Sequence, residues 1–383
     1  MSPLLSLSAT FRSIHIRSTS ILNCVSELRR RQIKNVFSNR QLCRLVLGIE
    51  TSCDDTAAAV MDETGSILGE SLYSQKDVHL KAGGIIPPVA QRLHREHIAR
   101  VTQEALDMSG VAPSDLSAVA TTVKPGLALS LGVGLDYSIK FIQQHKKPFI
   151  PIHHMEAHAL TVRMIEPVQF PFLVLLVSGG HCLLAVSKGV DDFLLLGKSL
   201  DEAPGDILDK VARRLSLISH PECSTLSGGQ AIEHIAKQGI PMGQLLSCVN
   251  DIAAAVQYTV ASHIAKRTHR AILFCKAKGL LPQNSATLVV SGGVASNQYI
   301  RKTLKIVTDS TDLTLLCPPA KLCTDNGVMI AWNGIERLRE GKGILNHVEN
   351  ICYEPKAALG TDISGQVREA AIKVPRLKLE IKE

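Results

Sequence analysis

Two histidines one helical turn apart are the residues of this chain with the clearest chemical potential. His154 and His158 lie in the run HHMEAH, and their four-residue spacing places both imidazoles on one face of a helix. That geometry suits a metal ion, although a helix-surface pair without a metal explains the spacing equally well. Asp325, in the run CTDNG just before a predicted helix, offers a third ligand. An Asp at that place is most often only a helix N-cap.

The same run resembles the HExxH pattern of zinc proteases only superficially. In that pattern the Glu directly follows the first His, whereas Glu156 comes two residues after His154, about 200° round the helix. A Glu in that position does not reach a water molecule on the metal. A metalloprotease is therefore the weaker of the competing interpretations.

Two further candidates are turns that follow apolar strands. The predicted strand 45–49 ends in ETSCDDT, which contains Asp54, and the predicted strand 173–177 ends in SGGH, residues 178–181. Glycine and small hydroxyl residues let backbone N–H groups approach a phosphate, and an acidic residue can orient a metal ion or a nucleophile. Ordinary hairpin turns have the same composition.

These turns belong to segments that look like copies of each other. Residues 45–72 and 173–200 are equally long and align without a gap at an offset of 128, with eight identical positions. Each reads as apolar run, polar turn, apolar run, acidic turn, apolar run, which predicts a meander of three strands. If a twofold axis relates the halves, the two turns face each other across a cleft.

After each meander, predicted helices alternate with two more strands, which favours parallel pairing and helical layers. The expected elements are helix 87–108, strand 117–123, helix 127–144, strand 148–153, helix 155–165, helix 204–215, helix 231–237, helix 251–276, strand 286–290, helix 298–308, strand 313–317 and helix 326–339. We therefore expect an α/β protein of two similar lobes with a ligand cleft between them.

Two weaker candidates lie in the second half. The run SGGVASN, residues 291–297, closes a predicted strand and opens a helix, so its glycines would let a nucleotide approach the backbone; a tight turn is an equally good interpretation. Asp209 lies on a predicted helix and could accept hydrogen bonds from ribose hydroxyls, although a solvated charge is the simpler interpretation.

The basic charge of the chain is confined to its N-terminus. Of the net charge of +7, residues 1–44 supply all seven units, and the remainder is neutral. This serine-rich basic leader without a long apolar run predicts a mitochondrial transit peptide, with a disordered tail as the alternative. An RNA partner would then depend on a local basic patch, and a solvated helix face is the alternative. The candidates are Arg213, Arg214, Lys266, Arg267 and Arg270.

Composition sets further limits. With 383 residues and 45% apolar content the chain can fill two cores, and aromatic residues make up only 4%, so a surface of base-stacking platforms is not indicated. The ten cysteines include no CxxC pair, which suits a reduced compartment such as the mitochondrial matrix. No apolar run is long enough to predict a membrane span.

The runs ETSCDDT, GGIIPP, HHMEAH, LVSGGH, LDKVAR, SGGVASN and CTDNG, in that order, closely resemble the threonylcarbamoyltransferases of the TsaD type, specifically the mitochondrial branch. The resemblance extends over about residues 46–333. It implies the duplicated actin-like fold of the ASKHA superfamily, with two lobes and a central cleft. The expected divisions are a leader at 1–44, an N-terminal lobe at 45–170, a C-terminal lobe at 171–340 and a tail at 341–383.

The resemblance also implies a reaction. Threonylcarbamoyl-adenylate from a separate synthase would give its threonylcarbamoyl group to N6 of the adenosine beside the anticodon, position 37, in mitochondrial tRNAs that read codons beginning with A. One divalent metal ion per subunit, iron or zinc, would be held by His154, His158 and Asp325, and Asp54 would orient or deprotonate the attacking amine. The adenylate would be bound by Leu176, Val177, Ser178, Gly179, Gly180, Asp209, Gly229, Glu233, Ser296 and Asn297.

The chain departs from the family at the join 237–244, where members carry some tens of further residues, and at Lys124, where many have glycine. We expect from the join that the second lobe is destabilised or the enzyme impaired. In that case the chain would be a nucleotide-binding partner that modifies no tRNA. Whether it forms a homodimer stays open.

Overall fold

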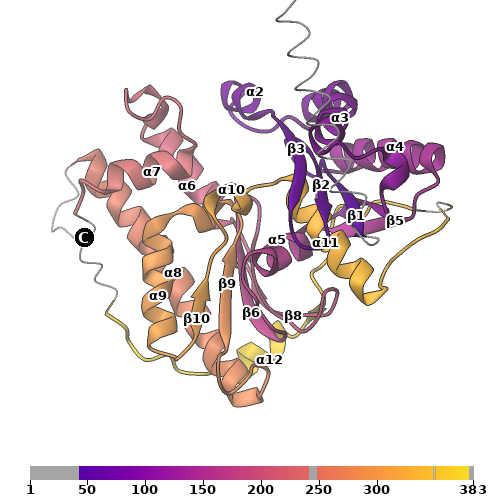
Figure 1. Cartoon of the computed structure of the whole chain (residues 1–383). Helices are drawn as coiled ribbons and strands as arrows, with labels where there is room; N and C mark the ends of the chain where they lie inside the picture. Colours follow the sequence, from indigo (N-terminus) through magenta and orange to yellow (C-terminus); the bar gives the residue numbers. More distant parts are fainter. Residues whose placement is uncertain (1–42, 241–247, 348, 350, 379–383) are drawn as a thin grey trace, which may run out of the picture. The chain divides into compact units, whose positions relative to one another are not determined.

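Two mixed β-sheets with the same strand order form the framework of the molecule (Figure 1). The computed structural model describes residues 43–240, 248–347, 349 and 351–378. The chain from Leu45 onward is one compact unit. The predicted leader up to residue 42 and residues 241–244 of the join lie outside the described residues.

The first sheet has the order β3-β2-β1-β4-β5. It consists of β1 (Leu45–Glu50), β2 (Asp55–Asp62), β3 (Ile67–Ser74), β4 (Ala118–Lys124) and β5 (Phe149–His153). The first three strands form an antiparallel meander, while β4 and β5 run parallel to β1. Every residue of β1 is buried, as expected for a central strand with covered faces.

The second sheet repeats this pattern. Its order is β10-β9-β6-β7-β8-β11, so β8, β7, β6, β9 and β10 correspond to β3, β2, β1, β4 and β5. The strands are β6 (Phe172–Val177), β7 (Cys182–Ser187), β8 (Phe193–Lys198), β9 (Thr287–Ser291), β10 (Thr314–Leu316) and β11 (Thr361–Asp362). The predicted duplication is confirmed, and the molecule has the duplicated actin-like fold.

Eight helices lie close to their predicted positions, and the short helices α2, α10 and α12 were not predicted. The helices are α2 (Lys76–Lys81), α3 (Pro87–Ser109), α4 (Ala128–His145), α5 (His154–Leu160), α6 (Pro204–Arg214), α7 (Gly228–Ala236), α8 (Val249–Lys278), α9 (Gln298–Asp309), α10 (Ala320–Cys323), α11 (Gly327–Glu340) and α12 (Ser364–Glu369). Proline at the first positions favours the start of α3, and Gly110 ends it in the left-handed region. The helix predicted at 155–165 is α-helical only to Leu160 and continues as a 3-10 turn.

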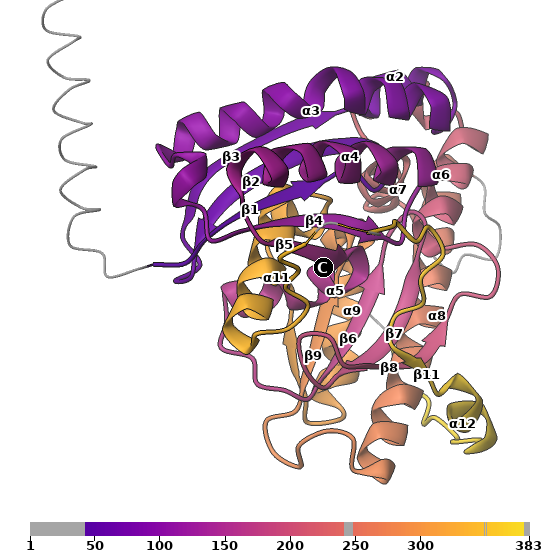
Figure 2. The same cartoon turned by 90° about the vertical axis from the view of Figure 1, so that its right-hand side faces the viewer.

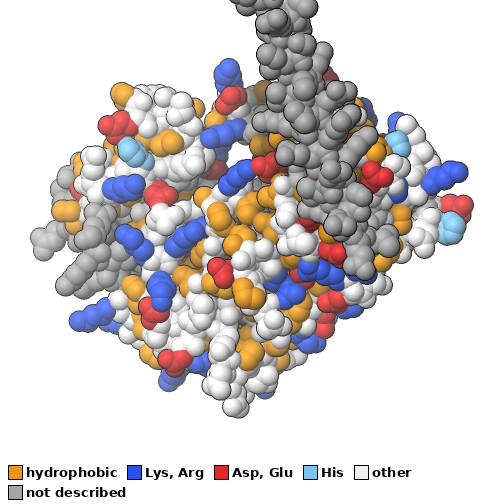
Figure 3. Space-filling view, in the orientation of Figure 1, with side chains coloured by type: hydrophobic (Ala, Val, Ile, Leu, Met, Phe, Trp, Pro, Cys, Tyr) orange, Lys and Arg blue, Asp and Glu red, His pale blue; other side chains and the backbone are white. Residues whose placement is uncertain are grey.

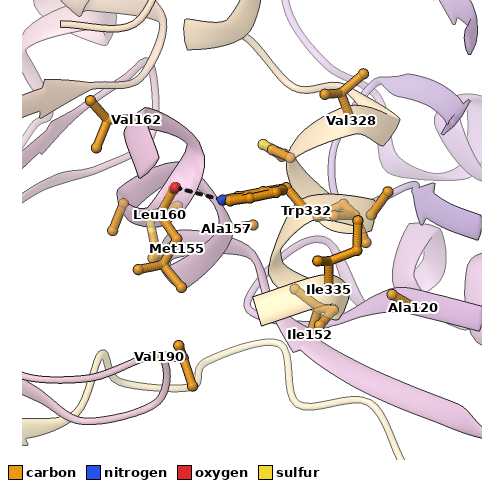
Figure 4. Close-up of a cluster of buried hydrophobic side chains, with 14 of the residues drawn as sticks. Ala120, Ile152, Met155, Ala157, Leu160, Val162, Val190, Val328, Trp332 and Ile335 are labelled. Atoms are coloured by element: carbon orange, nitrogen blue, oxygen red, sulfur yellow. Dashed lines mark hydrogen bonds between the residues drawn. The ribbon is translucent and has the colours of Figure 1, made fainter. Parts of the chain in front are cut away.

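Helices α5 and α11 join the two sheets. Helix α11 packs against β1, β2 and β4, whereas α5 contacts β6 and β9 as well as α11. Their apolar side chains form one continuous core with residues of both sheets, and the Trp332 indole N–H donates to the Leu160 carbonyl at 3.1 Å (Figure 4). The lobes therefore share a core between the two sheets.

Two glycines allow α11 to lie directly on the first sheet. A Cβ on Gly48 would be 2.3 Å from the backbone nitrogen of Ala331, and a Cβ on Gly327 would be 2.4 Å from the carbonyl carbon of Ala58. Real side chains do not reach such distances, so the backbones touch only because both residues are glycine. This contact fixes the start of α11 over β2.

The segment after α11 ties the sheets together, although the sequence shows little pattern there. Leu345 pairs with Phe149 of the first sheet, and the Glu354 N–H donates to the Val123 carbonyl at 2.9 Å. The chain then reaches the second sheet, where β11 pairs with β8 and α12 packs on that strand (Figure 2).

The two ends of the join lie side by side. The Ile240 N–H donates to the Asp251 carboxylate at 2.8 Å, and the Asn250 amide donates to Gln238 at 3.3 Å. The end of α7 thus meets the start of α8. Within the described part of the chain, no helix has the length and apolar character needed to cross a membrane.

Candidate functional site

The fold brings the three predicted metal ligands together. His158 Nε2 lies 3.2 Å from His154 Nε2 and 3.0 Å from Asp325 Oδ1, and the His154 Nε2–Asp325 Oδ1 distance is 3.4 Å. Ligands bound tetrahedrally at 2.0–2.1 Å are about 3.4 Å apart, so these three atoms have nearly the separation that one metal ion requires. Both imidazoles are buried. Among the described residues they form, with Asp325, a possible metal-binding group.

Asp325 is not a helix cap. The cap of α11 is the next residue, Asn326, whose side-chain oxygen accepts from the Met329 N–H at 2.8 Å. The Asp325 carboxylate is therefore available to the histidines of α5. The close contact of Gly327 with β2 explains how a residue 167 positions after His158 reaches it.

A buried carboxylate at the end of β1 orients His154. Glu50 Oε2 lies 3.1 Å from His154 Nδ1 and accepts from the Thr122 hydroxyl at 2.6 Å, while Oε1 accepts from the Ser52 N–H at 2.5 Å. With its proton on Nδ1, His154 directs Nε2 towards His158 and Asp325, as in carboxylate–histidine–metal arrangements. Glu50 was not predicted to have a role, although it is the acidic end of a buried strand.

The charges of this cluster are strongly coupled. Burial opposes ionisation of Asp325, but His154 and His158 outweigh it and hold the pKa of the carboxyl far below its usual range. Burial likewise opposes protonation of His154, yet Asp325 and Glu50 raise the pKa of the imidazole well above its usual value. Without a metal the cluster thus retains a proton, and a bound cation would displace it.

Asp54 and Asp55 follow the same strand. Burial raises the pKa of Asp54, and the nearby Asp325 charge acts in the same direction. Burial raises the pKa of Asp55 to about 7, and Asp54 and Asp325 contribute. The negative charge of Asp325 thus acts on both carboxyls. A carboxyl whose pKa is raised in this way suits proton transfer near neutral pH.

The glycine turn of the second lobe borders the same cluster. Burial lowers the pKa of His181, and the charges of His154 and His158 add to that effect. The Ser178 hydroxyl accepts from the His181 N–H at 3.1 Å, which closes the turn. A Cβ on Gly179 or on Gly180 would meet no atom within 4 Å, so space beside their backbone is free for a ligand.

Two other glycines support this turn: Gly205 was not predicted to have a role, and Gly292 was expected only to let a nucleotide approach the backbone. A Cβ on Gly205 would lie 2.7 Å from the Ser178 carbonyl oxygen, and one on Gly292 would lie 2.5 Å from the Val177 carbonyl oxygen. Gly292 also has a φ of +98°, which disfavours other residues. The start of α6 and the loop after β9 therefore press against both sides of the turn.

Other residues predicted to bind the adenylate lie on α6, on α7 and directly before α9. Asp209 accepts from the Gly229 N–H at 2.9 Å, and Glu233 accepts from the Gln298 N–H at 2.7 Å. Asn297 caps α9, accepting from the Ile300 N–H, and its amide donates to Gln257 at 2.9 Å. Ser296 lies in the 3-10 turn before α9. These contacts connect α6, α7, α8 and α9 into one wall.

Leu176 and Val177 differ from the other predicted binding residues. Both lie in β6, with only 2% and 0% of their surface exposed, and their side chains belong to the apolar cores. Only their backbone could therefore contact a ligand.

Glu156 points away from the metal ligands. Its carboxylate accepts from the Arg337 guanidinium at 2.6 Å in a buried ion pair. Burial raises the pKa of this carboxyl, which Arg337 partly opposes. The predicted separation of Glu156 from the ligand face agrees with this contact, so the geometry does not favour the protease interpretation.

The sequence matches one protein family model and is similar to curated proteins of that family. Residues 66–332 match the family model TsaD, described as tRNA N6-adenosine threonylcarbamoyltransferase. The mitochondrial tRNA N6-adenosine threonylcarbamoyltransferase of Danio rerio is 65% identical over 397 residues, covering 93% of this chain and 98% of that protein. The Homo sapiens protein of the same name is 64% identical over 380 residues, covering 89% and 92%.

A solved structure supports the fold alone. HypF of T. kodakarensis matches with a TM-score of 0.52 at 13% identity, over 78% of this chain and 48% of HypF.

Proposed function

The chain belongs to the tRNA N6-adenosine threonylcarbamoyltransferase family, and we propose that it makes N6-threonylcarbamoyladenosine at position 37 of mitochondrial tRNAs that read codons beginning with A. The donor is threonylcarbamoyl-adenylate. The observation that carries the proposal is the convergence of His154, His158 and Asp325 beside the glycine turn at 178–181.

The residues have distinct tasks in this reaction. Backbone N–H groups of Gly179 and Gly180 hold the phosphate of the adenylate, while Asp209, Gly229, Glu233, Ser296 and Asn297 hold its nucleoside. The exocyclic amine of the tRNA adenosine attacks the carbamoyl carbonyl carbon, and AMP leaves with the electron pair of the broken C–O bond. Asp54 accepts the proton that the amine loses, for which its raised pKa is favourable.

The ligand set fits one divalent metal ion. Two imidazoles and one carboxylate suit iron or zinc and leave positions open for a substrate oxygen. When bound, such an ion is a Lewis acid that stabilises negative charge on the reacting carbonyl and phosphate.

The proposal includes partners and a compartment. A separate synthase supplies the adenylate. The relatives are named mitochondrial, and the basic leader predicted from the sequence supports a location in the mitochondrial matrix.

The shortened join between α7 and α8 bears on activity. The 397 aligned positions of the Danio rerio relative exceed the roughly 356 residues that 93% of this chain supplies, so about 40 positions lack a counterpart here. The comparisons favour an enzyme over a nucleotide-binding partner. We still expect restoration of a family segment at the join to increase stability or turnover. No gain in either would show that the segment is dispensable.

The test is incorporation of labelled threonine into unmodified mitochondrial tRNA by the protein from Leu45 onward, with an adenylate-forming synthase, ATP and bicarbonate. Incorporation should require Asp325, so Asp325→Ala should abolish it and lower metal content. The control is Asp309→Ala, which removes an exposed carboxylate that pairs with Lys305.

Two results would contradict the proposal. The first is a folded wild-type protein that binds adenine nucleotide but incorporates no threonine. That result would support the alternative, a nucleotide-binding partner that modifies no tRNA. Equal activity of Asp325→Ala and the control would remove the metal site from the reaction.

A further inference from the structure

The longest stretch of the described chain without acidic residues lies on α8 and α9. From Ile252 to Thr308 there is no Asp or Glu, while eight Lys and Arg residues occur. Figure 3 shows Lys and Arg side chains over these two helices. The chain after its leader is therefore neutral as a whole, but residues 252–308 carry an excess of positive charge.

Three cations and one histidine of α8 share one face. His263, Lys266, Arg267 and Arg270 follow the spacing i, i+3, i+4 and i+7, which places them along a single stripe. Lys266 and Arg267 are exposed, and in the described chain no acidic side chain pairs with Lys266, Arg267 or Arg270. Burial lowers the pKa of His263, and the charges of Arg267 and Lys266 lower it further.

A cavity opens beside this stripe. It has a volume of about 300 Å³ and lies between α8 and residues 374–377 of the C-terminal segment. Lys266 and Arg376 contribute charge, and Ser262 and His269 line it with polar atoms. His269 is only 4% exposed, and its Nδ1 and the Ser262 hydroxyl are buried without a hydrogen-bond partner. Lys266 and Arg376 would attract an oxygen-rich anion into this cavity.

Helix α8 also connects this surface to the proposed reaction site. Gln257 accepts from Asn297, one of the proposed adenylate-binding residues. Lys266, Arg267 and Arg270 follow nine to thirteen residues later, which is about 14–20 Å along the helix axis. An RNA with one base at the reaction site therefore has backbone phosphates within reach of the stripe.

We propose that Lys266, Arg267, Arg270 and Arg376 form an RNA-backbone surface that holds the tRNA substrate, with one phosphate in the cavity beside His269. This inference rests on the proposed function and adds where its macromolecular substrate docks. Of the basic residues that the sequence suggested, Arg213 is excluded, because its guanidinium donates to the Gly83 carbonyl at 2.7 Å.

The experiment measures binding of an unmodified mitochondrial tRNA transcript at several salt concentrations. The test variants are Lys266→Glu/Arg267→Glu and the single change Arg376→Glu. The control is Arg95→Glu/Lys140→Glu, which alters charge equally on exposed positions of α3 and α4. We expect the double variant to bind about tenfold more weakly, with a salt slope reduced by about two, while nucleotide binding and metal content stay unchanged.

Three outcomes would overturn the inference. The test variants bind tRNA like wild type, the control loses as much affinity as the double variant, or the double variant loses binding to vesicles with anionic headgroups while tRNA binding persists. Threonine incorporation by the wild-type protein is measured in parallel. If wild type incorporates threonine and the variants bind normally, only the docking surface is wrong; if wild type incorporates none, the proposed function itself fails.

Discussion

Glu50 is a buried carboxylate that orients a candidate metal ligand without being a ligand itself. It accepts from Ser52 and Thr122 and faces Nδ1 of His154, all within 3.1 Å. Burial alone would neutralise this carboxylate, but His154 outweighs that effect and lowers its pKa. The retained negative charge increases the basicity of the imidazole towards a metal.

Changing Glu50 to Gln should therefore weaken metal binding. The amide has the same shape but lacks the charge, and loss of such an outer carboxylate costs about 10–100-fold in affinity. The measurement is an equilibrium titration of the metal-free protein with zinc against a competing chelator. Glu166→Gln, an exposed change, is the control. Equal affinities of Glu50→Gln and wild type would leave Glu50 with a purely structural role.

Asp55 should make stability depend on pH. Its pKa is 3.8 in the unfolded chain and about 7 in the folded protein, mainly because of burial. Between these values the folded state holds a proton that the unfolded state has lost, so stability falls as pH rises from about 4 to about 7. Asp55→Asn removes this penalty. In metal-free protein it should stabilise by about 1–3 kcal/mol at pH 8 and by much less at pH 4.

The check is urea unfolding of both proteins at pH 4 and pH 8, with Asp136→Asn as an exposed control. The same stability difference at both pH values would show that folding does not raise the pKa of Asp55.

At the scale of the elements, the position of α11 decides where Asp325 lies. Gly327→Ala should push the start of this helix away from β2, because the new Cβ would meet the backbone of Ala58. We expect a loss of about 1–3 kcal/mol in unfolding free energy and weaker metal binding. Gly365→Ala in α12 is the control, since its Cβ meets nothing within 4 Å. Thermal unfolding and zinc titration of both variants test this. Unchanged metal affinity in Gly327→Ala would show that the position of α11 does not determine metal binding.

The elements themselves were accessible from the sequence. The meanders and the long helices follow from hydrophobic periods of two and 3.6 residues, and those signals are local. Strand β11 was missed because two residues carry no period, and their pairing with β8 depends on residues far away. The ligand set followed from motif resemblance, but Glu50 contacts a histidine 104 residues later, and Glu156 pairs with Arg337 181 residues later. No local pattern encodes such contacts.

At the scale of the whole molecule, α2 and the loop after it make two hydrogen bonds with the second lobe. Arg213 of α6 donates to the Gly83 carbonyl, and Lys76 of α2 donates to the Thr225 carbonyl at 3.5 Å. Gly83 and Gly84 both have positive φ values, and their surroundings are open. Helix α6 also carries Asp209, so this contact connects the adenylate wall to a loop of the first lobe.

Arg213→Ala should therefore affect substrate capture more than chemistry. Loss of one exposed hydrogen bond is worth about 1 kcal/mol, so KM for the adenylate should rise about fivefold with kcat nearly unchanged. Arg214→Ala, an adjacent exposed change, is the control. Steady-state threonine incorporation separates the two constants. A fall in kcat without a change in KM would place Arg213 in the chemical step instead.

The late position of α11 in the chain has a consequence for synthesis. Its residues, 327–340, cover one face of a sheet that begins at Leu45, whereas α3 and α4 cover the other face. The ribosome has therefore made nearly 300 further residues before the face under α11 is covered. Until then this apolar face of β1 and β2 has no permanent neighbour, and contacts of such long sequence separation form slowly. The first half of this protein is thus a nascent segment that needs protection from aggregation until its own C-terminal part arrives.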